Sequence, residues 1–200
     1  MKEFNSIDSA LEQYKQDLIN NGEKVEDQRG DKVYTLPFYS IKFTNYIKNV
    51  GGMGIIEVPK SSPLNYESIK KYANQLLSGN IDDFVYTYGN RLIEYFEVNQ
   101  YEVMENRIKE DINSRRAIAV TYDPKQDNNI EDIPCLIMLK ITYFNNKLDL
   151  GVVFRSNDIK YAFSANLYAL MVVHKYICEN LNLRIGDLYY VCFDPHWKEI

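Results

Sequence analysis

"IPCLIMLKITYFNNKLDLGVVFRSND" (residues 133–158) is the stretch of sequence that decides the fold. Two runs rich in apolar and β-branched residues, 133–144 and 147–155, flank an Asn-Asn dipeptide, a combination typical of two strands joined by a turn. The pattern therefore predicts a pair of adjacent strands. A cysteine, Cys135, stands at the start of the first strand, and the polar tetrapeptide 155–158 ends the second.

The rest of the chain predicts helices together with further strands. Strand-like composition recurs at 31–47, 115–123 and 186–197. Apolar residues at helical spacing predict helices at 6–22, 65–79, 100–114 and 164–183, the last one apolar enough to be buried. In the third helix, Tyr101, Met104, Ile108 and Ile112 are expected on one face. With no repeat and no linker, residues 1–200 are expected to form a single α+β domain, with helices packed on a mostly continuous sheet.

Composition excludes several classes of protein. The net charge of −5 argues against binding to duplex nucleic acid, which relies on a positive surface. No apolar stretch is long enough to span a bilayer or to act as a signal peptide, so no membrane partner and a cytoplasmic location are expected. Three widely spaced cysteines and two histidines predict neither a disulfide framework nor a metal site.

Side chains capable of chemistry gather at the predicted strand ends, where sites commonly lie. They are Ser114-Arg115-Arg116, Cys135, the tetrapeptide Arg155-Ser156-Asn157-Asp158, and Asp194-Pro195-His196-Trp197. Each has an ordinary structural explanation: a solvated turn, a small core residue or a hydrogen-bonded turn. We interpret His174, Cys178 and Cys192, which fall inside predicted core elements, as structural.

The order and spacing of these residues are more specific than any one of them. An arginine pair, then a proline-cysteine strand, then Arg155 with Asn166 eleven residues beyond it, and finally His196, resemble the thymidylate synthase family. The resemblance covers residues 84–198 well and is without gaps from Arg155 to His196. It implies a mixed β-sheet packed with helices and a homodimer formed through the sheet.

The resemblance also implies catalytic residues. The family transfers a one-carbon unit to C5 of a pyrimidine nucleotide, usually dUMP, after a thiolate adds to C6. Cys135 matches this nucleophile, which a positive neighbour such as Arg155 should help to ionise. Asp158 matches a carboxylate that acts near the base, and Tyr88 matches a tyrosine that assists proton removal from C5.

Substrate-binding residues are implied in the same way. Arginine forks suit a phosphate, and the positions that match the phosphate ligands are Arg29, Arg115, Arg116, Arg155 and Ser156, with the arginine pair reaching the partner subunit's site. Asn166 matches the residue that reads the base, because an amide can pair with both O4 and N3–H of uracil. His196 matches a ligand of the sugar 3′-hydroxyl.

Some positions depart from the family pattern and leave alternatives open. Leu136 stands where a histidine is common, Lys198 replaces a tyrosine, and Glu67 is the candidate for a glutamate that organises water. The sequence ends four residues after His196, which resembles the shorter archaeal members. The carbon carrier is therefore expected to be 5,10-methylenetetrahydrofolate or a methanopterin analogue. A nucleotide 5-hydroxymethylase and a non-catalytic nucleotide binder are the alternative functions.

Overall fold

A computed structural model describes residues 1–81 and 84–198. The helices are α1 (Ile7–Asn21), α2 (Tyr66–Leu76), α3 (Tyr88–Ile93), α4 (Gln100–Glu110) and α5 (Phe163–Leu181), with a 3₁₀ turn at Asp127–Asn129. The strands are β1 (Lys2–Phe4), β2 (Glu23–Glu26), β3 (Lys32–Thr35), β4 (Tyr39–Phe43), β5 (Ile47–Val50), β6 (Met53–Ile56), β7 (Ile118–Val120), β8 (Leu136–Phe144), β9 (Lys147–Asp158) and β10 (Ile185–Lys198). These elements confirm the predicted α+β class.

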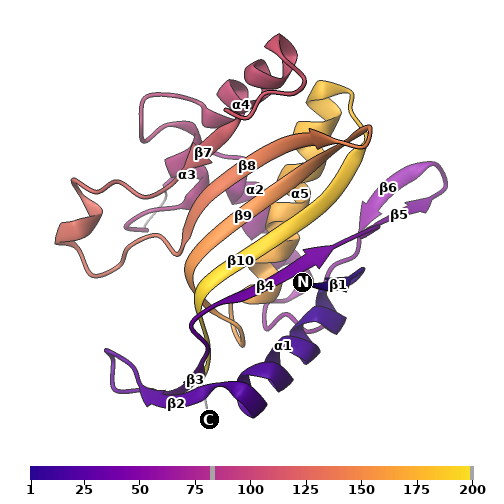
Figure 1. Cartoon of the computed structure of the whole chain (residues 1–200). Helices are drawn as coiled ribbons and strands as arrows, with labels where there is room; N and C mark the ends of the chain where they lie inside the picture. Colours follow the sequence, from indigo (N-terminus) through magenta and orange to yellow (C-terminus); the bar gives the residue numbers. More distant parts are fainter. Residues whose placement is uncertain (82–83, 199–200) are drawn as a thin grey trace.

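One mixed sheet organises the molecule (Figure 1). Its strand order is β1-β4-β10-β9-β8-β7, and the hairpin of β2 and β3 joins it through β3 and β10. The predicted pair β8 and β9 is antiparallel across the turn Asn145-Asn146, where both residues have positive φ. Strands β9 and β10 run parallel, so their carboxyl ends lie at the same end of the sheet.

The sheet has one buried face and one open face. Along β9, Leu148, Leu150, Val152 and Phe154 are buried, while the residues between them are partly exposed. This alternation follows from the period of two in a strand. In Figure 1, α5 and α2 lie behind the sheet and cover its buried face, and among the described residues no helix lies over the front.

Helix α5 forms the centre of the core. Thirteen of its nineteen residues are buried, as its continuous apolar sequence predicts, and it packs against α1, α2 and α4. Helix α1 begins at Ser6, whose hydroxyl oxygen accepts a hydrogen bond from the backbone N–H of Ser9. The hairpin of β5 and β6 projects from the body of the protein in Figure 1.

The structure differs from the sequence-based expectation at several element ends. Helix α4 ends at Glu110, so Ile112 does not share the buried face of Tyr101, Met104 and Ile108, and it is 37% exposed. Strand β8 begins at Leu136, one residue after Cys135. Pro134 has no N–H, and its carbonyl accepts from the Arg155 side chain, so the backbone there does not continue the sheet ladder.

Candidate active site

A polar cavity of about 420 Å³ lies where the carboxyl ends of β9 and β10 meet the start of β8. This size falls within the range of small-molecule sites. Of the residues to which the resemblance assigns a catalytic or substrate-binding role, eight line it: Arg29, Tyr88, Cys135, Arg155, Ser156, Asp158, Asn166 and His196. The sheet brings together Cys135, just before β8, and the residues at the ends of β9 and β10, because β8 is antiparallel to β9, whereas β10 is parallel to it. Helix α5, helix α3 and the turn between β2 and β3 add Asn166, Tyr88 and Arg29.

Arg155 holds the segment that carries Cys135. Its backbone N–H donates to the Cys135 carbonyl at 2.9 Å, and its Nε donates to the Pro134 carbonyl at 3.0 Å. Its Nη2 donates to the Ile133 carbonyl at 2.9 Å and lies 3.5 Å from Cys135 Sγ. Since a guanidinium has five N–H donors, the two on Nη1 remain for a ligand.

Opposing effects act on the pKa of the Cys135 thiol. Burial raises the pKa of Cys135, and the nearby Asp132 and Asp158 carboxylates raise it further. Arg155 and, more weakly, Arg29 lower it, but burial prevails and the pKa stays above its ordinary value. The positive neighbours expected from the sequence are therefore present, yet this arrangement favours the thiol over the thiolate.

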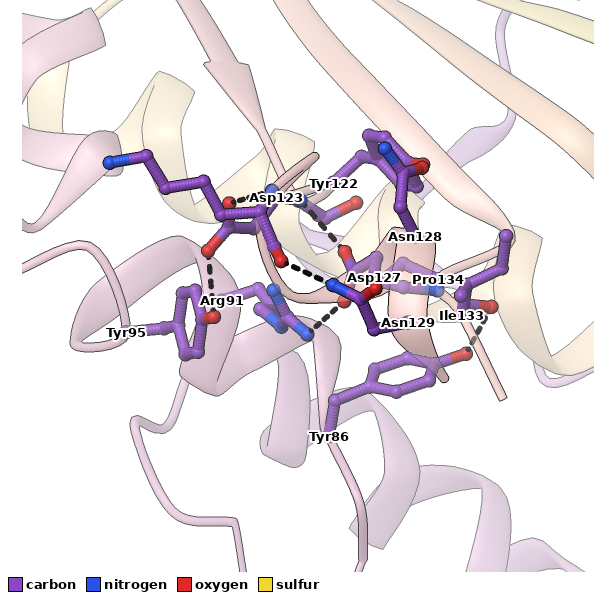
Figure 2. Close-up of polar contacts among 12 residues, drawn as sticks. Tyr86, Arg91, Tyr95, Tyr122, Asp123, Asp127, Asn128, Asn129, Ile133 and Pro134 are labelled. Carbon is purple, nitrogen blue, oxygen red and sulfur yellow. Dashed lines mark hydrogen bonds and ion pairs between the residues drawn. The ribbon is translucent and has the colours of Figure 1, made fainter. Parts of the chain in front are cut away.

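A buried ion pair fixes the loop that precedes Cys135 (Figure 2). Arg91 on α3 lies 2.6 Å from Asp127, and both side chains are almost fully buried. The Arg91 guanidinium also lies over the Tyr95 ring, 3.9 Å from its centroid. Nearer the cavity, the Tyr86 hydroxyl donates to the Ile133 carbonyl at 3.3 Å, the same carbonyl that Arg155 binds. Helix α3 thus supports the Cys135 loop.

Ser156 and His196 lie beside each other on β9 and β10. Ser156 Oγ is 3.3 Å from His196 Nδ1, and both side chains face the cavity. Asp158, which ends β9, accepts from the backbone N–H groups of Lys160 and Tyr161 through Oδ1, both at 2.9 Å. These hydrogen bonds hold the Asp158 carboxylate in the turn just before α5.

The turn between β2 and β3 forms the lip of the cavity. It places Arg29, which is exposed, near enough to Cys135 to affect the pKa of that thiol. Lys198, at the position where the resemblance implies a tyrosine, lines the same cavity and lies 2.5 Å from the Asp31 carboxylate. The departure from the family pattern therefore puts an ion pair at the lip.

Asn166 and Tyr88 lie deeper in the cavity. Asn166 is in the first turn of α5 and accepts a hydrogen bond from the Tyr72 hydroxyl at 2.6 Å. The Tyr88 hydroxyl accepts from the backbone N–H of Leu136 at 3.2 Å, and burial raises the pKa of Tyr88 well above its ordinary value. The Tyr88 phenol is therefore neutral, and it supports the residue next to Cys135.

The arginine pair lies elsewhere within one chain. Arg115 and Arg116 are exposed and line a separate hollow together with Arg107, before β7 at the edge of the sheet. Glu67 is exposed at the start of α2 and does not line the cavity. The residue of α2 that does line it is Tyr72, which the sequence analysis did not single out.

The sequence analysis gave no individual role to Asn157, whose buried side chain lies next to Asn166. A tyrosine in an amphipathic helix and an asparagine inside a polar tetrapeptide carry no distinct signal of their own.

A second, smaller hollow of about 260 Å³ shares Tyr72 and Tyr88 with the cavity and includes Phe84, Val85 and Tyr86. Phe84 and Val85 are more than half exposed there.

The remaining histidine and cysteines lie in the core. Burial lowers the pKa of His174 to about 4, and its ring nitrogens contact the Tyr46 hydroxyl at 2.5 Å and the Leu148 carbonyl at 2.7 Å. Cys178 and Cys192 are buried. Within residues 1–81 and 84–198, no group of three or more His, Cys, Asp or Glu side chains is arranged to hold a metal ion.

The fold and the cavity together define an α+β protein in which the Cys135 thiol lies beside Arg155 in a polar cavity. The family description "Thymidylate synthase" matches residues 63–198, and this chain belongs to that family. In the part of the chain that the structure describes, no helix combines the length and apolar character needed to cross a membrane.

Curated relatives include archaeal proteins provisionally named as thymidylate synthases. One from Methanosarcina mazei is 34% identical over 90% of this chain and 80% of its own length. One from Methanopyrus kandleri is 35% identical over 90% of this chain and 83% of its own. A third, from Methanothermobacter thermautotrophicus, is 28% identical over 99% of this chain and 93% of its own.

Proposed function

We propose that this protein transfers a one-carbon unit to C5 of a uracil nucleotide, converting dUMP to dTMP through a covalent bond between Cys135 and C6. The observation that carries the proposal is the Cys135 thiol, 3.5 Å from Arg155 Nη2 in a polar cavity of a thymidylate synthase family member. The relatives' names agree with this activity.

The nucleotide phosphate would bind at the lip of the cavity. Arg155 Nη1, the Ser156 hydroxyl and the Arg29 guanidinium supply donors on that side. Arg115 and Arg116 lie in a separate hollow of their own chain, so in this proposal they complete the phosphate site of the partner in a homodimer. His196 would then contact the sugar, and Asn166 the base.

The chemistry follows from the thiol. When Cys135 ionises, its sulfur adds to C6 of the uracil ring, and the electron pair of the C5–C6 bond moves onto C5 and O4. C5 thereby becomes nucleophilic toward the one-carbon unit. Loss of the C5 proton and departure of the sulfur then restore the ring. Because the Tyr88 phenol is neutral, we assign it to orient a proton-accepting water, with Asp158 near the base.

The one-carbon donor would be 5,10-methylenetetrahydrofolate or a methanopterin analogue. When bound, such a carrier supplies a carbon at the oxidation level of formaldehyde and, for a methyl product, a hydride. The aromatic hollow next to Cys135 fits a flat pterin, because Tyr86, Tyr88 and the exposed Phe84 offer ring surfaces. A 5-hydroxymethylase would use the same residues and add water in place of hydride.

The test is loss of bromide from 5-bromo-dUMP in the presence of a thiol and without any carrier. This reaction needs attack at C6 but no carbon donor. Wild-type protein is expected to release bromide from 5-bromo-dUMP but not from 5-bromo-dCMP, and Cys135→Ala protein to release none. If wild type releases no bromide yet binds dUMP tightly, the protein is a non-catalytic nucleotide binder and the proposal is wrong.

A further inference from the structure

Both ends of the Asn166 side-chain amide are tied to the protein. The Tyr72 hydroxyl donates to Asn166 Oδ1 at 2.6 Å, and Asn166 Nδ2 donates to Asn157 Oδ1 at 3.1 Å. Asn157 is held in turn, because its Nδ2 donates to the Tyr190 hydroxyl at 3.0 Å. The amide therefore has a defined direction, with its oxygen toward Tyr72 and its nitrogen toward Asn157.

Tyr72 is placed by the packing of two helices, and its hydroxyl keeps the proton that it donates to Asn166. Tyr72 lies in the middle of α2, which packs along α5, the helix that carries Asn166. Burial raises the pKa of Tyr72, so the phenol keeps its proton at neutral pH. Tyr72 also lines the cavity together with Cys135 and Asn166, so it is part of the wall that faces the ligand.

One donor and one acceptor of Asn166 remain for a base. Of the two Nδ2 protons, one is used by Asn157, and of the two Oδ1 lone pairs, one is used by Tyr72. Uracil offers an acceptor at O4 and a donor at N3–H, whereas cytosine offers the reverse, a 4-amino donor and an N3 acceptor. The direction of the amide thus decides which base it fits.

We propose that Tyr72, acting through the amide of Asn166, is a positioning residue that makes the site prefer uracil over cytosine. Cytosine in the same pose would set its amino group against Asn166 Nδ2, donor against donor. Turning the amide to suit cytosine would replace the Tyr72 O–H donation to Asn166 Oδ1 with a bond in which Tyr72 accepts, and it would set Asn166 Oδ1 against Asn157 Oδ1, two acceptors. This inference rests on the proposed function, since it assumes a pyrimidine at Asn166.

The experiment compares dissociation constants of dUMP and dCMP by calorimetry for wild type, Tyr72→Phe and Tyr101→Phe. Tyr101 is a matched control, because its buried hydroxyl donates to the Leu76 carbonyl of the same helix α2 but does not touch Asn166. Tyr72→Phe is expected to reduce the preference for dUMP by about fivefold, equivalent to about 1 kcal/mol for one hydrogen bond. Tyr101→Phe is expected to leave the preference unchanged.

The outcomes separate this inference from the proposed function. An unchanged ratio in Tyr72→Phe, while wild type still debrominates 5-bromo-dUMP, overturns the role of Tyr72 and leaves the reaction standing. A lowered ratio in a protein that never debrominates supports Tyr72 and overturns the reaction. If wild type itself does not distinguish dUMP from dCMP, the inference is wrong. If Tyr72→Phe does not fold, Asn157→Ser, which frees the other end of the amide, must lower the ratio instead.

Discussion

At the scale of single residues, the Cys135 thiol shows how neighbouring groups set reactivity. Its pKa is raised by burial and lowered by Arg155, with burial prevailing. A thiolate alkylates and a thiol does not, so iodoacetamide should label Cys135 slowly at neutral pH and faster as the pH rises. The midpoint is expected above the ordinary cysteine pKa. Arg155→Met removes the main lowering charge and should move the midpoint higher still.

This prediction is measured by mass spectrometry of the Cys135 peptide over a pH series. Cys135→Ala protein gives the background from Cys178 and Cys192, both buried. Arg29→Met is the control for charge alone, and since Arg29 lowers the pKa less than Arg155 does, its shift should be smaller. A wild-type midpoint below the ordinary value would mean that Arg155 outweighs burial.

Asn166 is the second residue whose chemistry can be changed by one atom. In Asn166→Asp, the carboxylate can only accept hydrogen bonds, so it should favour the amino group of cytosine over O4 of uracil. The ratio of dUMP to dCMP affinity is expected to fall by tenfold or more, since acceptor meets acceptor at O4. Equal relative affinities in wild type and variant would remove Asn166 from base reading.

Residues close in the sequence motif were predictable, whereas their partners in space were not. Arg155, Ser156 and Asp158 lie within one strand end, so the spacing alone placed them together. Tyr72 and Asn166 are 94 positions apart and meet only because α2 packs on α5. Glu67 does not line the cavity. Glu67 and Tyr72 both lie on α2, but the helical turn places Tyr72 on the side toward the cavity and leaves Glu67 exposed.

At the scale of elements, helix α3 and the loop before β8 depend on the Arg91–Asp127 pair. Removing one member of a buried pair leaves an uncompensated charge, which commonly costs about 3–5 kcal/mol. Arg91→Met should therefore lower the free energy of unfolding by about that amount. The double variant Arg91→Met with Asp127→Asn carries no buried charge at this place and should lose less.

Urea unfolding of the single and double variants measures this effect. The control is Lys175→Met, which breaks the exposed pair of Lys175 with Glu179 and should change stability by less than about 0.5 kcal/mol. If Arg91→Met is no more destabilising than Lys175→Met, the pair does not hold the loop. A lower rate of 5-bromo-dUMP debromination in the folded variant would link this support to Cys135.

Long elements were predictable because their periodicity extends over several turns or residue pairs. Helices α1, α2 and α5 and strands β8, β9 and β10 were all expected from the sequence. Two short elements were not predicted: α3 has six residues, and β1 has three. Such segments carry little periodicity, and their structure depends on partners distant in the chain, as β1 depends on β4.

At the scale of the whole molecule, the open face of the sheet is the surface that the proposed homodimer would cover. Four apolar residues form a row across the neighbouring strands β7, β8, β9 and β10. In this row Val120 pairs with Met138, Met138 with Val153, and Val153 with Val191. This row fits the proposed homodimer through the sheet, since an isolated chain would leave it against water. Beside the row, the exposed Arg115 and Arg116 precede β7 at the edge of the same sheet.

If two chains share each site, mixing two inactive variants should restore activity, which a site built from one chain could not do. If Arg116 serves the cavity of the partner, Cys135→Ala and Arg116→Ala proteins should each be inactive alone. Mixing and refolding them gives heterodimers in which one site carries both defects and the other carries none. Activity in dTMP formation or in bromide release should therefore return, up to about a quarter of wild type for random pairing of equal amounts.

The matched control exchanges Arg116 for an arginine of the same cavity as Cys135. In heterodimers of Cys135→Ala with Arg155→Ala, each site keeps one defect, because Arg155 lies 3.5 Å from the Cys135 sulfur of its own chain. No activity should return in that mixture. Recovery in both mixtures would mean that activity returns even where each site should keep a defect, so it would not support sharing of Arg116. Recovery in neither would assign Arg116 to its own chain and overturn the shared site.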